Sequence, residues 1–438
     1  MKTKNISLFG LLGVLLLSAC GPTPGESISQ EPVSMDSEGN IIFNDVQITY
    51  GNPITGSDGT AMRRLVREFN AEFEGQINVQ ETFMSELEYY ESLNITIPMK
   101  RAYDVALVHS YKVAAFANKN LLFPIADLIE EAKIEISRED YLPDVFDSML
   151  FDEQLYGVPL DIHTTVLYYN QDLLDQYSAT VPTKRSELIA AAKKMPNTNA
   201  GGWGMPLAAA WPSEYIYTTA FYQFGGVEID SEANPSYNNQ IGVDALKSVA
   251  DLIHVEKISP LNVSVDSDLM LFNQGKAMFH INGDWMINSM KESGINFGVT
   301  SLSKMFNETG ASADKMASRA HTFVLPQGRN QTLKQQASLT FMKWMTEHAY
   351  IWAEGGGHVP ASNIARESEE YLALPHHADY GNVLDFKLNP TSPYYYEAFS
   401  PVFQQVTKAL QTPSYNALEL LNQAASEGRQ LVLEAKSS

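Results

Sequence analysis

The chain has 438 residues, which at about 100 to 200 residues per domain predicts two domains or one large one. Hydrophobic residues make up 44% of the chain and charged residues 19%, which is typical of a globular protein and not of a disordered one. The formal net charge is −22, which excludes nucleic acid as a partner because phosphates must be neutralised by clustered cations.

The N-terminus has the charge and hydropathy pattern of a secretory signal peptide. Lys2 and Lys4 precede an apolar run that ends at residue 19, which is shorter than the roughly 20 residues of a membrane-spanning helix. The run ends in Leu-Ser-Ala-Cys, and Cys20 is the only cysteine, so an intramolecular disulfide and a Cys-ligated zinc or iron–sulfur site are excluded. This ending resembles a bacterial lipobox, in which the cysteine is acylated and becomes the first residue of the mature chain. The alternative is an ordinary signal peptide with an incidental cysteine.

We therefore expect residues 1–19 to be a signal peptide and residues 20–44 to be a lipid anchor followed by a flexible linker. The linker segment is rich in Pro, Gly, Ser and acidic residues and lacks apolar periodicity. Two or three acyl chains on Cys20 would hold the protein to a membrane. The expected location is extracytoplasmic, on the outer face of the cytoplasmic membrane, or in the periplasm of a double-membraned cell.

The body begins with alternating strands and helices. Residues 46–50 alternate as a half-buried strand, residues 62–73 carry apolar side chains at helical spacing, and further strands are expected at 77–83 and 104–109. This βαβ order predicts an α/β fold. Later helices are expected around residues 241–253, 341–345 and 418–431.

Ligands of open α/β sheets collect beyond the carboxyl ends of the strands. Four polar or aromatic residues of the first half of the chain stand at such places: Tyr50, Glu81, His109 and Tyr111. Each of them could instead be an ordinary rim residue, so they count as candidate site residues only as a group.

Three stretches carry a resemblance to a known family. They are residues 103–125, residues 156–174 with Tyr-Gly-Val-Pro and Leu-Tyr-Tyr-Asn-Gln-Asp-Leu-Leu, and residues 272–285 with Phe-Asn-Gln-Gly-Lys-Ala-Met and Gly-Asp-Trp. In type and spacing they resemble the sugar-binding lipoproteins of ABC importers, a family of extracellular solute-binding proteins that includes the maltose-binding proteins. Residues 357–361 resemble the Gly-x-x-Pro that closes a helix in the family's first lobe.

The resemblance implies a two-lobed α/β fold of the periplasmic-binding-protein type II class, with a ligand cleft between lobes joined by hinge crossings. The first lobe would comprise residues 45–160 plus about 302–363, and the second about 161–301 plus 364–438. The crossings are expected near Asp161, near Ser301 and after Asn363.

A sugar presents apolar C–H faces and a rim of hydroxyls, so its site needs flat aromatic rings beside amide or carboxylate groups. The segment Asn282-Gly283-Asp284-Trp285 supplies both kinds of group. The resemblance makes Trp285 the stacking ring, with core packing as the alternative, and Asn282 and Asp284 candidate hydroxyl ligands.

Further candidates come from three other segments. Trp211 and Tyr215 are expected at the second lobe's cleft edge, and Asp161 and His163 on the hinge stretch, where Asp161 would bind hydroxyls or make a hinge hydrogen bond. Tyr395, one of three adjacent tyrosines, is a candidate for a third aromatic edge. Trp344 and Trp352 are expected to pack in the core.

The sequence carries no Walker, His-Glu-x-x-His or Gly-x-Ser-x-Gly motif, so we expect no enzymatic activity and no cofactor. His376 and His377 lack metal-ligand spacing, and residues 196–202 lack the carboxylates of a calcium loop, so no metal site is expected.

The function expected from these observations is capture of a sugar or oligosaccharide by a monomer, and its delivery to ABC permease subunits served by a separate ATPase. One alternative is a non-sugar solute such as a peptide, although no arginine stands in the expected site segments to clamp a carboxylate. Another is a lipid-anchored glycoside hydrolase using Asp161 and Asp284 as its paired carboxyls.

Overall fold

The computed structural model describes residues 34–37, 41–197, 202–328, 332–380 and 382–437. The expected signal peptide, Cys20 and most of the expected linker lie outside these residues. Within the described part, no helix combines the length and the apolar character that crossing a membrane would need.

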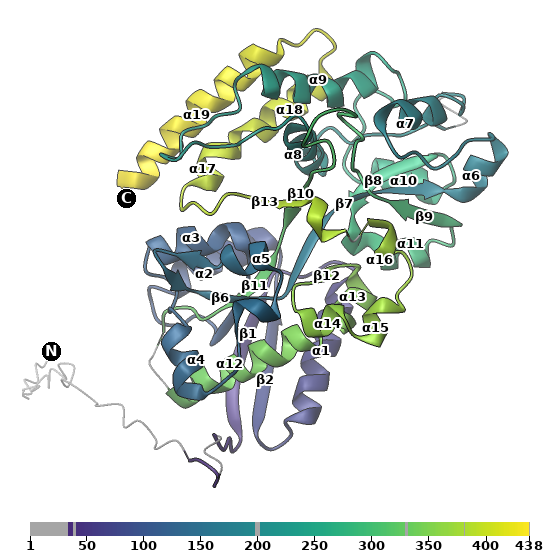
Figure 1. Ribbon diagram of the computed structural model, residues 1–438. Coiled ribbons are helices and arrows are strands. Elements are labelled where there is room, and N and C mark those ends of the chain that lie inside the picture. Colours follow the sequence, from purple (N-terminus) through teal and green to yellow (C-terminus); the bar gives the residue numbers. More distant parts are fainter. Residues whose placement is uncertain (1–33, 38–40, 198–201, 329–331, 381, 438) are drawn as a thin grey trace, which may run out of the picture. The chain divides into compact units, whose positions relative to one another are not determined.

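The first sheet has five strands in the order β2-β1-β3-β11-β6 (Figure 1). β1 (Val46–Asn52) runs parallel to β2 (Ile77–Phe83) and to β3 (Val105–His109). β11 (His321–Val324) is antiparallel to β3 and to β6 (Gly157–Pro159). The three parallel strands therefore end at one edge, where the loops after β1 and β3 can contribute to a site.

The apolar pattern of the sequence explains these elements. Val46, Ile48 and Tyr50 alternate as buried residues on β1. In α1 (Gly59–Glu72) the residues at helical spacing are buried against the sheet, so the helix has one apolar face: Met62, Leu65, Val66 and Phe69. The strands and the helix predicted for this segment are confirmed.

The second sheet is built around one long strand, β7 (Asp161–Asn170). Its first residues pair with β12 (Val359–Pro360) and β10 (Met316–Arg319), and its later residues pair with β8 (Phe279–Gly283) and β9 (Phe297–Thr300). β13 (Phe386–Leu388) adds to β10 in parallel. Almost every residue of β7 is buried, and the side chains of Asp161, His163 and Thr164 hydrogen-bond within the protein.

The chain passes between the two sheets through single residues. Leu160 separates β6 of the first sheet from β7 of the second, and Ala320 separates β10 of the second from β11 of the first. The first crossing lies where the sequence placed it, beside Asp161. The second lies at Ala320 and not near Ser301, because residues 316–319 form a strand of the second sheet that the sequence reading did not identify.

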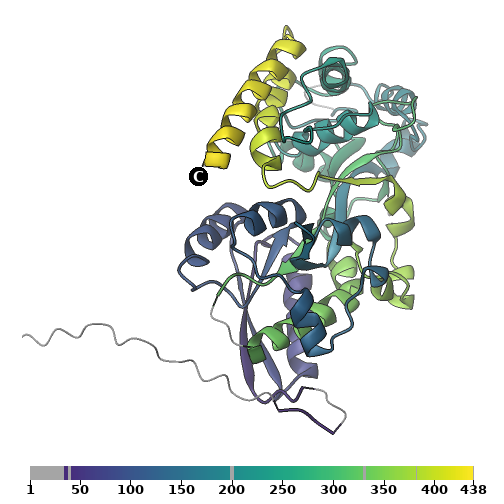
Figure 2. The same ribbon diagram turned by 60° about the vertical axis from the view of Figure 1, so that its left-hand side comes forward.

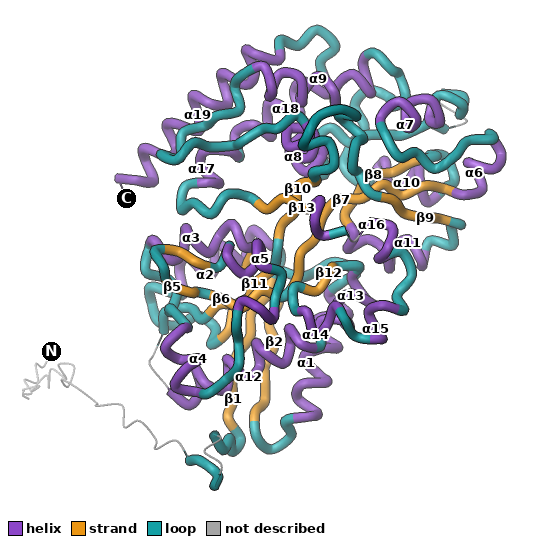
Figure 3. The backbone as a smooth tube through the Cα atoms, in the orientation of Figure 1, coloured by secondary structure: helices purple, strands orange, loops and turns teal. Residues whose placement is uncertain are grey.

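Helices surround the strands (purple around orange in Figure 3). α12 (Thr332–Glu347) and α13 (Ala349–Gly356) pack with α1 beside the first sheet, and α8 (Ser213–Gln223) packs on β10 of the second. α9 (Gln240–His254), α18 (Pro401–Gln411) and the C-terminal α19 (Ala417–Ser437) pack together beyond α8, as Figure 2 shows for the yellow helices. The helices predicted around residues 241–253, 341–345 and 418–431 are confirmed.

The remaining elements connect these layers. They are α2 (Glu86–Thr96), α3 (Ser110–Asn118), α4 (Ala126–Ala132), η1 (Arg138–Asp140), α5 (Pro143–Asp147), β4 (Leu150–Phe151), β5 (Gln154–Leu155), α6 (Gln171–Gln176), α7 (Arg185–Ala192), α10 (Ser267–Asn273), η2 (Asp284–Met286), α11 (Ile287–Glu292), α14 (Asn363–Arg366), α15 (Glu369–Leu372), α16 (His377–Tyr380), η3 (Val383–Asp385) and α17 (Tyr395–Phe399). The α/β class is confirmed, with two sheets that each carry their own helices.

Candidate functional site

A cavity of about 240 Å³ is lined by residues from both sheets and their loops. The first sheet supplies the loop after β1, the end of β3 and the start of β11, and the second supplies β7, β10 and the segments after β8 and before α8. The lining residues are Pro53, Ile54, Thr55, Gly56, Asp58, Glu86, His109, His163, Trp211, Tyr215, Trp285, Arg319, His321 and His358.

One wall of the cavity is aromatic. The rings of Trp211 and Trp285 stack with centroids 6.2 Å apart and planes inclined by 28°, and Tyr215 packs against both at 5.6 Å and 5.9 Å. Trp285 lies directly over Gly283, where a Cβ atom would stand 2.0 Å from the indole. The orientation of Trp285 therefore requires glycine at position 283.

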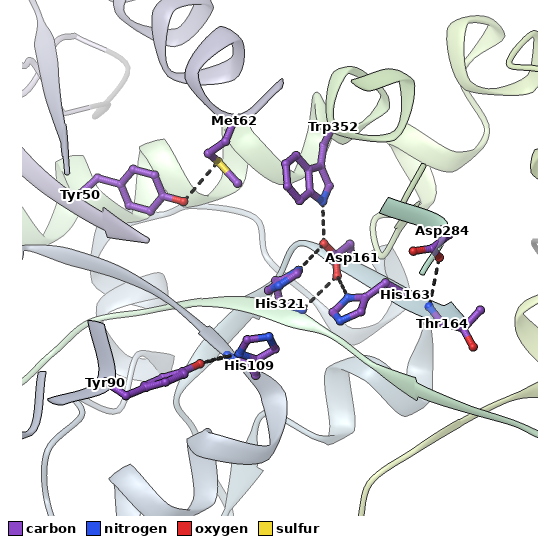
Figure 4. Close-up of polar contacts among 10 residues, drawn as sticks. All are labelled: Tyr50, Met62, Tyr90, His109, Asp161, His163, Thr164, Asp284, His321 and Trp352. Atoms are coloured by element: carbon purple, nitrogen blue, oxygen red, sulfur yellow. Dashed lines mark hydrogen bonds and ion pairs between the residues drawn. The ribbon is translucent and has the colours of Figure 1, made fainter. Parts of the chain in front are cut away.

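A buried carboxylate holds the floor of the cavity (Figure 4). Asp161 Oδ1 is 3.0 Å from His163 Nδ1 and accepts a hydrogen bond from the backbone N–H of His321 at 3.0 Å. Its Oδ2 is 2.8 Å from His321 Nδ1 and accepts from the Trp352 indole N–H at 2.6 Å. Figure 4 shows Trp352 on one side of the carboxylate and both imidazoles on the other. All four lone-pair positions of Asp161 are therefore used by protein donors.

Four of the chain's nine histidines meet at this floor. The ring centroids of His163 and His321 are 4.4 Å apart, His109 is 4.8 Å from His321, and His358 is 5.4 Å from His163. His109 is held by the hydroxyl of Tyr90, 2.6 Å from its Nδ1 (Figure 4).

Burial and mutual repulsion set the charge of these groups. Burial, with His321 nearby, lowers the pKa of His163 to about 4, and burial lowers the pKa of His109 and His358 well below the usual value. Burial opposes ionisation of His321 as well, but Asp161 outweighs it and raises the pKa of His321. Burial likewise opposes ionisation of Asp161, and the surrounding imidazoles outweigh it, so its pKa lies well below the usual value. At the floor, Asp161 and His321 thus form an ion pair, and the imidazoles of His109, His163 and His358 are neutral.

Arg319, the last residue of β10, brings a second positive charge to the cavity. Its guanidinium is 3.2 Å from a carboxylate oxygen of Glu214 and lies over the rings of Tyr215, at 4.4 Å, and Tyr111, at 5.2 Å. The expected site segments contain no arginine, but Arg319 lines the cavity, so a neutral solute can no longer be inferred from the lack of an arginine to clamp a carboxylate.

Five of the residues predicted from the sequence line this cavity: Trp285, Trp211, Tyr215, His163 and His109. They come from segments far apart in the chain, and the meeting of β3, β7 and the segment after β8 brings them together. Their roles in ligand binding stay predictions.

The other predicted residues lie elsewhere. Asp161 is fully buried beneath the imidazoles, and Asp284 is fully buried with its Oδ2 3.1 Å from the backbone N–H of Thr164. Burial raises the pKa of Asp284 well above its usual value. The Asn282 side chain accepts a hydrogen bond from the Gly283 N–H at 2.8 Å, so its oxygen is used within its own strand.

Glu81 and Tyr395 also have partners in the protein. Glu81 accepts a hydrogen bond from the Asn52 side chain at 2.9 Å, and Tyr395 is buried in α17 with its ring 6.3 Å from that of Tyr111. Tyr50 is buried in the first sheet, where its hydroxyl lies 3.3 Å from Met62 Sδ (Figure 4). As expected, Trp344 and Trp352 are buried.

Sequence reasoning missed Arg319, His321, His358 and Glu86, whereas the loop after β1, which it expects at a site edge, does line the cavity at residues 53–58. The signal available was the recurrence of histidine beside β-rich runs, in Asp-Ile-His, Ala-His-Thr-Phe-Val and Gly-His-Val-Pro. A buried histidine next to a strand is unremarkable alone, and only the fold shows that three of them converge. The predicted absence of a calcium loop at residues 196–202 concerns a segment of which 198–201 lie outside the described residues.

Comparisons with known proteins agree with this arrangement. The family model described as bacterial extracellular solute-binding protein matches residues 64–379. The galactooligosaccharide-binding protein of Bacillus subtilis is 25% identical over 317 residues, covering 69% of this chain and 69% of its own length.

Solved structures share the fold at lower identity. The GacH receptor of Streptomyces glaucescens, solved unliganded and with acarbose, matches with a TM-score of 0.76 and 20% identity over 89% of this chain and 99% of its own. The maltose/maltodextrin-binding domain of Bdellovibrio bacteriovorus, bound to maltotriose, matches with a TM-score of 0.74 and 20% identity over 88% and 99% of the two chains. The two-lobed fold of these binding proteins, expected from the sequence, is therefore confirmed.

Proposed function

The chain belongs to the bacterial extracellular solute-binding protein family, and from that premise we propose that it captures a sugar or oligosaccharide in the cavity between its two sheets and delivers it to an ABC importer. The observation that carries the proposal is the wall formed by Trp211, Trp285 and Tyr215. Indole rings offer flat apolar faces of the kind that stack on the C–H face of a sugar ring.

The other lining groups suit the rim of a sugar. Glu86, Asp58 and Arg319 bring acceptors and donors to the same cavity, as hydroxyl groups require. The named ligands of the relatives are galactooligosaccharide, acarbose and maltotriose. They support a carbohydrate as the solute here.

Contacts between the two halves support a mechanism of cleft closure. Tyr111 on α3, next to the first sheet, stacks on Tyr396 of α17 with centroids 5.9 Å apart, and Lys112 Nζ lies 4.2 Å from the centre of the Tyr396 ring. A solute that touches both halves stabilises the arrangement in which these contacts form, by the difference in its affinity for the open and closed states. The permease subunits would then bind the closed form of the protein, and separate subunits would hydrolyse ATP.

Calorimetric titration of the purified full chain with mono- and oligosaccharides tests the solute class. At least one carbohydrate should bind, and Trp211→Ala should weaken it by about two- to tenfold, as expected for loss of one aromatic stacking contact. Trp344→Phe is the matched control, since Trp344 lies outside the cavity and bonds to Glu72. Binding of a peptide or amino acid, with failure of every sugar, would refute the carbohydrate assignment and favour the alternative left open by Arg319.

A hydrolase role has no support from the cavity. Neither Asp161 nor Asp284, the two carboxyls proposed for it, lines the cavity, and both accept hydrogen bonds from the protein. A test is release of reducing sugar by the purified chain, which we expect not to occur.

We further propose that the protein is a monomer tethered through an acylated Cys20, with residues 20–44 as anchor and linker. The lobes would comprise the ranges expected from the sequence, residues 45–160 plus about 302–363 and about 161–301 plus 364–438, except that residues 302–319 precede the crossing at Ala320 and would belong to the second lobe. The tether rests on the lipobox-like ending at Cys20. Cys20→Ala should move the protein from the membrane fraction to the soluble fraction, and retention on the membrane would argue against acylation at this residue.

A further inference from the structure

The floor of the cavity has the composition of a transition-metal site. Asp161, His163, His321 and His358 are all buried, and each can offer one ligand atom such that the four atoms lie within 4.8 Å of one another. Imidazole nitrogens suit Zn²⁺, Cu²⁺ and Ni²⁺, whereas Ca²⁺ and Mg²⁺ take oxygen ligands. We propose that the imidazoles of His163, His321 and His358 bind a divalent transition-metal ion of the Zn²⁺ class, with Asp161 orienting two of them.

The ring spacing fits one ion held by three imidazoles. The centroids of His163, His321 and His358 are 4.4, 5.4 and 5.6 Å apart. In a tetrahedral site with Zn–N bonds of about 2.0–2.1 Å, the centres of two ligating rings lie about 5 Å apart. The observed separations bracket this value, so their spacing is that of three rings around one ion.

The hydrogen bonds of Asp161 fix the chemistry of two rings. His163 and His321 both turn Nδ1 toward its carboxylate, so each donates through Nδ1–H and directs Nε2 away from it. Nε2 of neutral His163 carries a lone pair, and a metal ion binding Nε2 of His321 would displace the proton of that imidazolium. Among the described residues, no hydrogen bond to either Nε2 is found. A carboxylate behind the ring is the usual outer support of a metal-ligating histidine, because it fixes the tautomer and raises the basicity of the ligating nitrogen. Asp161 is thus a positioning residue.

The third ring has an unusual environment. His358 stacks on Trp352 with centroids 4.2 Å apart, and its Nδ1 is buried without a hydrogen-bond partner in the described structure. Buried polar atoms without a protein partner are rare and commonly serve to bind an ion, a water molecule or a ligand. With no partner fixing its tautomer, this ring is free to present a lone pair to an ion.

Three protein ligands leave a fourth position on a tetrahedral ion. All three histidines line the cavity, so this position faces the space in which the solute is proposed to bind. A water molecule or an oxygen atom of the solute could occupy it. The metal site itself does not rest on the proposed function, because the three rings and Asp161 are present without any solute.

The test uses the purified full chain without an affinity tag, stripped with a chelator and titrated calorimetrically with ZnCl₂ alone. We expect the unmodified chain to bind one ion. The affinity of His358→Ala for Zn²⁺ should be at least tenfold lower, because removing even a residue that only hydrogen-bonds to a metal ligand lowers metal affinity by about tenfold or more. His358→Ala is the sharpest variant because it leaves the four hydrogen bonds of Asp161 in place. His376→Ala is the matched control, because His376 is partly exposed and lies outside the cavity, so its loss should not change the affinity.

A measurement on the unmodified chain covers the case in which His358→Ala fails to fold, which circular dichroism would reveal. X-ray absorption of the Zn²⁺-loaded chain should show scattering from about three imidazoles. The proposal is overturned if the unmodified chain binds no Zn²⁺, Co²⁺ or Ni²⁺, if a folded His358→Ala binds as tightly as the unmodified chain, or if the spectrum shows oxygen ligands only. Because metal alone is titrated, these outcomes are independent of whether any sugar binds.

Discussion

Replacing Asp161 by asparagine tests whether this carboxylate holds the two sheets together. Its oxygens accept from His163 Nδ1 and the His321 N–H on one side, and from His321 Nδ1 and the Trp352 indole on the other. An amide keeps one acceptor oxygen and turns the other into a donor. Two of the four donors then lose their acceptor, and each buried donor without a partner costs about 1–3 kcal/mol.

Tautomer changes relieve only part of this cost. Either imidazole can turn its Nδ1 into an acceptor for the new amide N–H₂ group, but neither the His321 backbone N–H nor the Trp352 indole can do so. One of these two donors is left unpaired whichever way the amide points. The expected destabilisation of Asp161→Asn is therefore at least about 1–3 kcal/mol and at most about 6 kcal/mol.

The assay is urea unfolding followed by circular dichroism, in buffer that contains a chelator so that metal binding does not contribute. Glu86→Gln is the control, because Glu86 lines the same cavity with its side chain 54% exposed and should change stability by less than about 0.5 kcal/mol. If Asp161→Asn unfolds within about 0.5 kcal/mol of the unmodified chain, the carboxylate does not hold the floor as argued here.

Two further predictions concern a buried acid and a glycine. Burial raises the pKa of Glu228 from 4.5 to about 7 and outweighs the opposite effect of the hydrogen bond that the Tyr222 hydroxyl donates to it, so the folded chain holds the Glu228 proton more tightly and loses stability as pH rises from about 4.5 through 7. Between pH 4 and pH 8, the free energy of unfolding of Glu228→Gln, measured with urea, should therefore rise by about 3 kcal/mol relative to that of the unmodified chain. A difference between the two chains that does not vary with pH would contradict the effect of burial on Glu228. Gly283→Ala should displace Trp285 and weaken sugar binding about two- to tenfold, with a change in indole fluorescence, whereas Gly328→Ala, whose Cβ would meet its nearest atom at 3.7 Å, should leave both unchanged. Equal affinities for the two glycine variants would show that the position of Trp285 does not matter for binding.

The fold was accessible from the sequence because its signals are local. Alternation at Val46, Ile48 and Tyr50 and helical spacing from Met62 to Phe69 specify elements that the structure contains. The aromatic wall was also accessible, because the family resemblance of residues 272–285 makes Trp285 a stacking ring and implies that Trp211 and Tyr215 lie at the cleft edge.

The floor of the cavity could not be predicted in the same way. His163, His321 and His358 are far apart in the chain, and they meet only because β7, β10 and β12 pair in one sheet while β11 continues β10 into the other. The sequence does not decide between a hydroxyl ligand and a hinge hydrogen bond for Asp161, because no sequence signal shows which donors surround a buried carboxylate. Its contacts with Trp352 and His321 depend on pairing between distant strands.

The position of these residues along the crossing strands separates the roles of floor and wall. Asp161 and His163 follow Leu160, and Arg319 and His321 flank Ala320, so the floor is built on the two points where the chain passes between the sheets. Residues at a pivot move little when two lobes rotate, whereas the aromatic wall stands on the segments before α8 and after β8, outside the two crossings. We therefore expect a metal ion at the floor to bind with similar affinity in open and closed states, and the aromatic wall to favour the closed one. By the reciprocity of coupled binding, sugar and metal should then change each other's affinity only to the extent that a sugar oxygen occupies the fourth position of the ion.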